Sequence, residues 1–279
     1  MTENEKLRIR EQILSYIKQA GSQKRAAEML GIAAATIHAL VHGEWDKLSD
    51  EMLRKLDAKT TRSKDWTVVE TGVFREISQV LTEAKADAMV TWIVSPAGSG
   101  KSTAARHYAQ TEPGCIYVLC SEDMYRKDFL HALARSAGFS LPPSNLRQTL
   151  HELVDRLLGM DHPLLIFDEA DKLSDNVIHY FIQLYNLLED HAGIVYLSTN
   201  YIERRMSRGL AYNKRGYAEM SSRLGRKFYR LYPVAETDVY GICAGNGITD
   251  EAMIGEIVAD AAGYEYDLRR VKKLVQARR

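Results

Sequence analysis

The chain has 279 residues, of which 46% are hydrophobic, and its formal net charge is zero. This length suits one large domain or two smaller ones, and the sequence has no 18-residue apolar run of the kind that spans a membrane. The charged N-terminus lacks the apolar segment of a secretory signal, and the three cysteines have no metal-binding spacing. We therefore expect a protein of the reducing cytoplasm without a membrane partner.

The N-terminal stretch predicts a small helical domain. Apolar residues recur at helical spacing over residues 7–19, and two shorter helices are predicted at 23–30 and 34–41. Residues 58–67 are polar and lack helical periodicity, which indicates a linker. We therefore predict an all-α domain at residues 1–64.

The spacing of Ala27, Gly31 and Ile37 across the two shorter helices resembles the helix-turn-helix of phage repressors. There a small residue lets the helices cross closely, a glycine makes the turn, and a β-branched residue packs behind the second helix. This arrangement would place Thr36 and His38 near the major groove of double-stranded DNA. Few side chains of the base-reading kinds occur on the second helix, so weak or non-specific DNA binding is expected. A helical bundle for protein contacts is the alternative.

A glycine-rich segment follows an apolar strand predicted at residues 89–94 and precedes good helix-forming residues. A strand, a glycine-rich turn and Gly-Lys-Ser at a helix start are the context of a phosphate-binding loop. Lys101 would reach the β- and γ-phosphates, and the Ser102 hydroxyl would bind Mg²⁺. Ser95 stands where the pattern has its first glycine, and serine is tolerated there if its φ stays negative. The candidate ATP-binding residues of this P-loop are Ser95, Pro96, Ala97, Gly98, Ser99, Gly100, Lys101, Ser102 and Thr103.

Two further buried strands are predicted at residues 115–120 and 163–167, and the second runs directly into acidic residues. Asp168 and Glu169 follow four consecutive apolar residues, as is typical of a parallel strand whose carboxyl end carries functional groups. A solvated acidic turn would have a similar sequence, but an upstream P-loop favours a nucleotide site. Asp168 is therefore a further candidate for the ATP site.

Basic residues concentrate between residues 202 and 230, where nine Lys or Arg stand against two Asp or Glu. Lys and Arg supply phosphate contacts, and the interleaved tyrosines can stack on bases, so this segment is expected to contact DNA. A solvated surface loop is the alternative. The candidate DNA-binding residues are Arg204, Arg205, Arg208, Lys214 and Arg215.

The order of the motifs resembles that of AAA+ ATPases, in which a strand ending in a polar residue follows the P-loop and the acidic strand end. That strand is predicted at residues 193–200 and ends in Asn200. The resemblance implies an α/β fold: an AAA+ P-loop core with a five-stranded parallel sheet and a small helical lid, preceded here by the all-α helix-turn-helix domain. The core would span residues 65–234 and the lid residues 235–279.

The same resemblance implies roles in binding and hydrolysing ATP. Asp168 would hold Mg²⁺ together with Ser102. Glu169 would orient or deprotonate the attacking water, and Asn200 would hydrogen-bond that water or the γ-phosphate. These roles would make the protein an ATPase with ATP and Mg²⁺ as its cofactors.

Two arginines complete the resemblance. The Ser-Ser-Arg-Leu run around Arg223 resembles the motif that carries the arginine finger, which acts on the γ-phosphate of a neighbouring subunit. The Asp-Leu-Arg run that ends at Arg269 resembles the sensor-2 motif of a lid, although a basic helix end is an alternative. The helix before the P-loop strand often covers the adenine in such ATPases, which makes Val73 and Phe74 candidates unless they are ordinary core residues. Alternative arginine fingers are Arg204, Arg205 and Arg226.

The layout as a whole resembles the AAA+ transposition regulators of the phage Mu transposition protein B type. This resemblance implies an ATPase that assembles with itself into helical filaments on double-stranded DNA, largely without sequence preference. The filament would activate a transposase partner, and hydrolysis would drive its disassembly. A loader ATPase of the replication-initiator type and a transcriptional regulator switched by ATP remain as alternatives.

Overall fold

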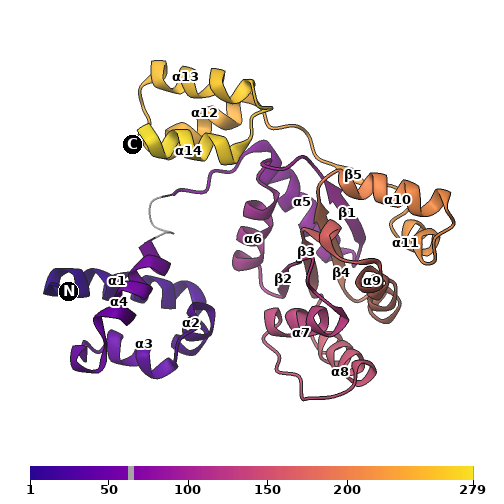
Figure 1. Ribbon diagram of the computed structural model, residues 1–279, viewed down its shortest axis with the longest axis horizontal. Helices are drawn as coiled ribbons and strands as arrows, with labels where there is room; N and C mark the ends of the chain where they lie inside the picture. Colours follow the sequence, from indigo (N-terminus) through magenta and orange to yellow (C-terminus); the bar gives the residue numbers. More distant parts are fainter. Residues whose placement is uncertain (62–65, 279) are drawn as a thin grey trace. The chain divides into compact units, whose positions relative to one another are not determined.

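The computed structural model describes residues 1–61 and 66–278 and separates into two compact units, residues 1–67 and 68–279 (Figure 1). The domain boundary predicted near residue 64 lies outside the described residues. None of the described helices is long and apolar enough to cross a membrane. Each unit buries hydrophobic side chains of its own.

The N-terminal unit is all-helical. Its elements are α1 (Glu3–Ala20), α2 (Gln23–Leu30), α3 (Ala34–Val41), the short 3₁₀ helix η1 (Trp45–Lys47) and α4 (Asp50–Thr61). Thr2 caps α1, because its hydroxyl accepts from the Glu5 N–H while the Glu5 carboxylate accepts from the Thr2 N–H. Gly21 ends α1 in the left-handed conformation. The helices predicted at 23–30 and 34–41 are confirmed as α2 and α3.

The helix-turn-helix spacing is present in α2 and α3. Ala27 and Ile37 are buried, and Gly31 makes the turn with a φ of 63°. On α3, Thr36 is half-buried, whereas His38 is exposed and its ring centroid lies 4.2 Å from that of His42. Of the two predicted DNA contacts in this unit, His38 is therefore the more accessible.

Helix α4 corrects the linker that the sequence predicts from residue 58, since the helix continues to Thr61. Leu53 and Leu56, three residues apart, form an apolar stripe that is fully buried, and α4 packs against α1. At its start the Ser49 hydroxyl accepts from the Met52 N–H at 3.2 Å. Burial of these leucines stabilises the whole helix. The polar residues of its last turn carry no helical pattern, so the sequence alone does not predict that the helix extends this far.

The second unit is built on a five-stranded parallel sheet. Its strands are β1 (Val90–Val94), β2 (Cys115–Leu119), β3 (Leu164–Asp168), β4 (Gly193–Ser198) and β5 (Tyr229–Arg230). They lie in the order β2-β3-β4-β1-β5. The strand before the P-loop and the strand that ends in Asp168 therefore flank β4, with their carboxyl ends at one edge. The predicted five-stranded parallel sheet is confirmed, with β5 as its shortest strand.

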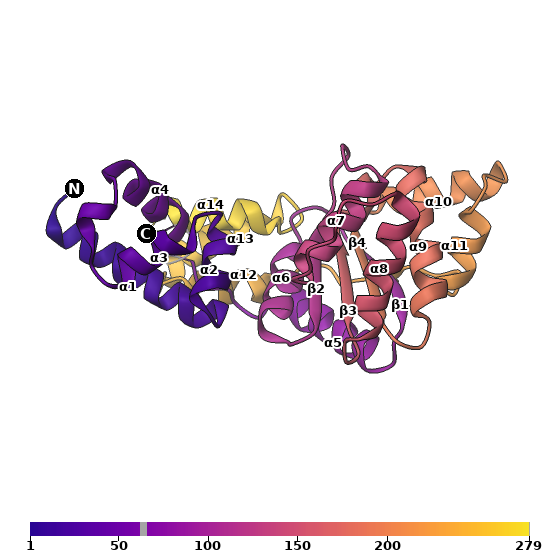
Figure 2. The same cartoon turned by 90° about the horizontal axis from the view of Figure 1, so that it is seen from below.

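Helices cover both faces of this sheet (Figure 1, Figure 2). The helices of this unit are α5 (Gly72–Ala86), α6 (Lys101–Thr111), α7 (Arg126–Ser136), α8 (Leu146–Leu158), the 3₁₀ helix η2 (Ala170–Lys172), α9 (Asp175–Leu188), α10 (Tyr201–Ala211), α11 (Tyr217–Arg223), α12 (Glu236–Gly245), α13 (Glu251–Ala262) and α14 (Leu268–Arg278), of which the last three stand apart from the sheet. Side chains alternate between the two faces of each strand. Trp92 and Val94 thus join the core formed with α7, α8 and α9, whereas Ile93 packs with α5 and α6. Helices α12–α14 pack against one another in the segment that the sequence predicts as the lid.

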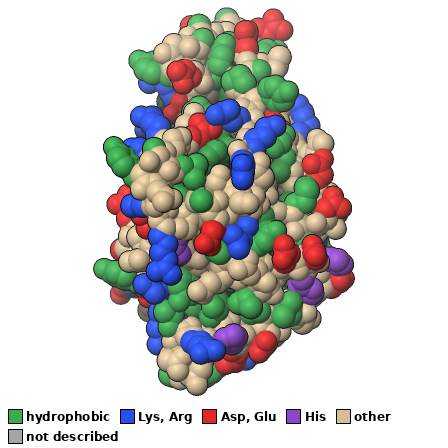
Figure 3. Space-filling view, turned by 90° about the vertical axis from the view of Figure 1, so that its right-hand side faces the viewer, with side chains coloured by type: hydrophobic (Ala, Val, Ile, Leu, Met, Phe, Trp, Pro, Cys, Tyr) green, Lys and Arg blue, Asp and Glu red, His purple; other side chains and the backbone are tan. Residues whose placement is uncertain are grey.

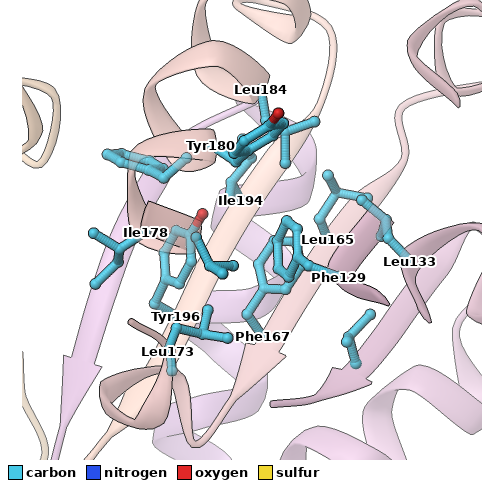
Figure 4. Close-up of a cluster of buried hydrophobic side chains, with 14 of the residues drawn as sticks. Phe129, Leu133, Leu165, Phe167, Leu173, Ile178, Tyr180, Leu184, Ile194 and Tyr196 are labelled. Atoms are coloured by element: carbon cyan, nitrogen blue, oxygen red, sulfur yellow. The ribbon is translucent and has the colours of Figure 1, made fainter. Parts of the chain in front are cut away.

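Stacked aromatic rings cross the sheet on its α7–α9 face (Figure 4). Phe129 of α7 stacks on Phe167 of β3 with ring centroids 5.1 Å apart. Phe167 stacks on Tyr196 of β4 at 5.1 Å, and Tyr196 stacks on Trp92 of β1 at 4.7 Å. Each such pair contributes about 0.5–1.5 kcal/mol beyond its buried area. The stack therefore helps to hold the three central strands together just below the edge that carries the candidate site.

Gly209 of α10 allows a test of how tightly α10 and α11 pack, with a second helical glycine as the control. A Cβ on Gly209 would lie 2.2 Å from the ring of Tyr217. We expect Gly209→Ala to lower the free energy of unfolding by about 1–3 kcal/mol because the buried ring must shift. Gly255→Ala in α13 is the control, since a Cβ there meets nothing within 4 Å; it should raise the free energy of unfolding by up to ~1 kcal/mol. Urea unfolding measures both, and a Gly209→Ala protein of undiminished stability would contradict the packing.

Candidate nucleotide-binding site

The P-loop connects β1 to α6. Gly98 and Gly100 have φ values of 82° and 95°, a left-handed conformation that other residues rarely adopt. Ser95 lies outside that region and is buried, so serine occupies the position of the first glycine without backbone strain. The Ser95 N–H donates to the Ser198 carbonyl at 3.3 Å, which joins the loop to β4.

Lys101 begins α6, and its ammonium group is folded back over the loop. Its Nζ donates to the carbonyls of Ser95 and Pro96 at 2.7 and 2.8 Å, and to Ser99 Oγ at 3.3 Å. Burial lowers the pKa of Lys101 to about 8, while the Asp168 carboxylate acts in the opposite direction. An anion placed beside this lysine would favour its charged form.

Both carboxylate oxygens of Asp168 are hydrogen-bonded at the end of β3, where the residue is 1% exposed. Oδ1 accepts from the Glu169 N–H at 2.9 Å, and Oδ2 accepts from the Tyr117 hydroxyl at 2.6 Å. Burial raises the pKa of Tyr117 well above its usual value, and the Asp168 charge acts in the same direction. The phenol is therefore a hydrogen-bond donor to this carboxylate.

Glu169 follows with a φ of 55°. This left-handed conformation is uncommon for a non-glycine residue and tends to occur at functional sites. The side chain faces the same cavity as the P-loop, and its Oε2 accepts from Lys172 Nζ at 2.5 Å. Glu169 is thus presented to the candidate site as an ion-paired carboxylate.

The end of β4 brings Thr199, rather than the predicted Asn200, to the cavity wall. Thr199 Oγ1 donates to Asp171 Oδ2 at 2.6 Å. Asn200 is exposed and already has helical backbone angles as the residue that precedes α10. The reason is that the strand ends at Ser198, two residues earlier than the sequence predicts.

The lid contributes Leu268 and Arg269. The Leu268 N–H donates to the Gly98 carbonyl at 2.9 Å, so the first turn of α14 is joined to the P-loop. Asp267 caps this turn by accepting from the N–H groups of Arg269 and Arg270. Arg269 lines the cavity, whereas Arg270 is ion-paired within the lid. The structure therefore places the predicted sensor-2 arginine beside the phosphate-binding loop.

These elements line a cavity of about 310 Å³. Its walls offer the backbone of a glycine-rich loop at a helix start, the Lys101 ammonium, and the oxygens of Ser102 and Asp168, which suit a triphosphate with Mg²⁺. Among the described residues no group of three His, Cys, Asp or Glu gathers that could hold a metal ion. A Mg²⁺ ion held by Ser102 and Asp168 would take its other ligands from phosphates and water.

Three cavity or neighbouring residues were not predicted from the sequence. Asp171 and Thr199 line the cavity, and Tyr117 contacts Asp168 from β2. Asp171 carries a sequence signal, since it is the next acidic residue after Asp168 and Glu169. Tyr117 carries no sequence signal, because its contact with Asp168 depends on which strand lies next to β3.

Val73 and Phe74, the candidates for adenine contact, are 1% and 7% exposed in the core on the α5–α6 face. The ring of Phe74 meets that of His107 on α6 with centroids 5.3 Å apart. The structure places both residues in the packing between α5 and α6, away from the walls of the phosphate cavity.

Arg223 lies at the opposite edge of the sheet, beside a second cavity at the amino ends of β1 and β4. Its Nε and Nη2 donate to Asn186 Oδ1 at 3.1 and 2.8 Å, and its guanidinium carbon lies 5.4 Å from the ring centroid of Tyr185. Arg223 thus takes no part in the phosphate cavity of its own chain.

The basic segment forms α10, α11 and the turn between them. Arg204, Arg208 and Arg215 are exposed. Figure 3 views the side of the molecule on which these helices lie and shows Lys and Arg side chains distributed among acidic and hydrophobic ones. The face therefore offers separate cationic side chains instead of one continuous basic patch.

Arg205 differs from the other basic candidates because its guanidinium is engaged within the fold. It donates to Asp175 Oδ1 at 2.5 Å and to the carbonyls of Leu173 and Asp171 at 2.7 and 3.1 Å. Although burial acts to raise the pKa of Asp175, hydrogen bonds from Lys214, Arg205 and the Tyr217 hydroxyl hold it far below its usual range. The structure therefore assigns Arg205 to the packing of α9 and α10, and it pairs Lys214 with Asp175.

Comparison with known proteins adds one family match. Residues 84–206 match the family model described as AAA domain, and no curated protein matches the chain. A chain from the structure of Drosophila ORC bound to DNA has a TM-score of 0.44 and 13% identity over 75% of this chain and 55% of that chain. The Thermotoga maritima RuvB Holliday junction branch migration motor has a TM-score of 0.36 and 14% identity over 74% of this chain and 68% of that chain.

The chain thus spans about half the length of the ORC chain that it matches. The family match covers the P-loop, the acidic end of β3 and the end of β4. Residues 84–206 are therefore similar to an AAA domain, and they lie in an α/β unit built on a five-stranded parallel sheet.

Proposed function

We propose that this protein is an ATP-dependent, largely non-sequence-specific DNA-binding ATPase. It would assemble with itself on double-stranded DNA and direct a transposase, with hydrolysis driving disassembly. One observation carries the proposal: Lys101, the Asp168–Glu169 pair and Arg269 converge on one cavity. The transposase partner rests on the layout of the chain, a helix-turn-helix unit before a minimal core and lid.

In the proposed site, Lys101 and the loop amides hold the phosphates, and Ser102 and Asp168 hold Mg²⁺. A Mg²⁺ ion held there would neutralise charge on the phosphate oxygens. Glu169 lies on the cavity wall and pairs with Lys172, and it would accept a proton from an attacking water. Arg269, on the wall of the same cavity, would contact the γ-phosphate from the lid.

Arg223 would act on the nucleotide of a neighbouring subunit, because it lies outside the phosphate cavity of its own chain. Its proposed role is to stabilise the charge that develops during phosphoryl transfer. Hydrolysis would then require self-assembly, which links turnover to the lifetime of the oligomer.

DNA contact is assigned to the accessible cations of α10, α11 and α3. Arg204, Arg208 and Arg215 are exposed, and Lys214 is a mostly exposed partner of Asp175. His38 is the accessible polar residue of α3. Phosphate contacts by such side chains give affinity without sequence preference.

The first test is DNA binding with ATP, with ADP and without nucleotide at one fixed salt concentration. We expect the ATP state to bind duplex DNA at least about tenfold more tightly, because a ligand shifts an equilibrium only by its differential affinity for the two states. Lys101→Ala should abolish this difference. Lys85→Ala is the matched control, since Lys85 Nζ also donates to a backbone carbonyl, that of Pro113, outside the cavity.

Fluorescence anisotropy with labelled duplex DNA measures these affinities. Equal binding in all three nucleotide states would contradict the proposal. Electron microscopy of the ATP-bound sample on duplex DNA distinguishes a filament from a ring or a site-bound dimer.

Mixed subunits test the arginine finger. Lys101→Ala subunits lack their own ATP site but carry Arg223, and Arg223→Ala subunits have the reverse defect. Each variant alone should hydrolyse ATP at less than about 1% of the wild-type rate, whereas their mixture on DNA should recover part of it. Arg226→Ala, three residues along the chain and exposed, is the control and should stay active. A mixture no more active than its components would remove Arg223 from this role.

Salt dependence tests the DNA contacts. Each phosphate contact contributes about 0.9 to the slope of log Kd against log salt, so the double variant Arg204→Ala/Arg215→Ala should lower that slope by about 1.8. The control is Arg135→Ala/Arg147→Ala, which removes two exposed arginines from α7 and α8. Equal slopes in the two double variants would place the DNA contacts elsewhere.

A further inference from the structure

The Tyr117 hydroxyl makes a contact with Asp168 that the proposed mechanism does not yet use. Tyr117 Oη donates to Asp168 Oδ2 at 2.6 Å, while Oδ1 accepts from the Glu169 N–H at 2.9 Å. The carboxylate is buried. Two donors on different oxygens therefore fix the rotation of the carboxylate about its last side-chain bond.

The sheet register explains how a tyrosine reaches this position. On the adjacent strands, Leu119 pairs with Asp168 and Tyr117 pairs with Ile166. Tyr117 thus lies two residues, or ~6.6 Å, before the level of Asp168, on the same face of the sheet. A phenol spans that distance, whereas the shorter hydroxyl side chains of serine and threonine do not.

Arg106 on α6 lies on the other side of the phenol. Its Nη2 is 3.4 Å from the Tyr117 hydroxyl oxygen, and its guanidinium carbon lies 5.4 Å from the ring centroid. The oxygen accepts from Arg106 and donates to Asp168, which directs the phenolic proton toward the carboxylate. The same helix begins with the P-loop residues Lys101 and Ser102, so the P-loop helix and β2 both contribute to the position of Asp168.

We propose that Tyr117 is a positioning residue for the magnesium-binding carboxylate of this ATP site. The inference rests on the proposed function, in which Ser102 and Asp168 hold Mg²⁺. Tyr117 occupies one lone-pair direction of Oδ2 and holds Asp168 in the rotamer in which its other acceptor directions remain available to a hydrated cation. Partners that orient a metal ligand typically change metal affinity by about 10- to 100-fold when removed.

Tyr117→Phe tests this role through binding instead of turnover. A fluorescent, non-hydrolysable ATP analogue is titrated in EDTA, and Mg²⁺ is then titrated at a fixed analogue concentration. We expect unchanged affinity for the analogue in EDTA and an increase of about tenfold in the Mg²⁺ concentration at half-saturation.

Tyr108→Phe is the matched control. The Tyr108 hydroxyl also makes a side-chain hydrogen bond, to Thr82 Oγ1 at 3.0 Å, and the residue packs in the same core cluster away from Asp168. Its removal should leave the Mg²⁺ midpoint unchanged. In the Asp168→Asn background, Tyr117→Phe should produce no further shift in the Mg²⁺ midpoint, because the carboxylate that it orients is absent.

Several outcomes would overturn the inference. They are a wild-type Mg²⁺ midpoint in Tyr117→Phe, equal weakening of the analogue with and without Mg²⁺, and an undiminished shift in the Asp168→Asn background. A wild-type protein that binds the analogue without any dependence on Mg²⁺ would overturn the proposed function itself, and with it this inference. Urea unfolding of both phenylalanine variants separates a general loss of stability from a change at the metal site.

Discussion

The parallel pairing of β4 with both β1 and β3 is the constraint on which the candidate site depends. Val94 pairs with Ser198, and Phe167 pairs with Tyr196, so the segments that leave all three strands emerge at one edge. This register brings the P-loop and the Asp168 carboxylate, distant in the chain, to the two sides of the β4 end. The stacked rings of Phe167, Tyr196 and Trp92 hold the same three strands from one face.

The wall of the phosphate cavity is physically continuous with the basic helices. Thr199 donates to the Asp171 carboxylate, and Arg205 donates to the Asp171 carbonyl and to Asp175. Asp175 in turn accepts from Lys214 and from the Tyr217 hydroxyl on α11. A displacement of α10 or α11 would therefore disturb the hydrogen bonds behind the end of β4. Such a connected network is a physical basis for coupling between two sites.

Much of the fold was predictable because it rests on local patterns. Buried parallel strands are apolar runs, and the P-loop is a contiguous motif, so the P-loop and the Asp168–Glu169 pair were found where the structure has them. The misses arise where a residue's role depends on tertiary neighbours. Arg205 reads as a DNA-binding residue in the sequence, but it is ion-paired with Asp175 in the structure. Thr199 lines the cavity instead of Asn200, because β4 ends at Ser198. Tyr117 becomes visible only once β2 is known to lie beside β3.

The hydrogen bond from the Leu268 N–H to the Gly98 carbonyl joins the first turn of α14 directly to the P-loop. The P-loop and the first turn of α14 share a backbone contact, so the loop conformation and the docking of the lid are not independent equilibria. By linkage, the effect would be reciprocal. If a nucleotide shifts the lid toward its docked position by a given factor, then a ligand that holds the lid docked would tighten nucleotide binding by the same factor. A partner that binds only α12–α14 could thus speed nucleotide release or slow it without contacting the phosphates.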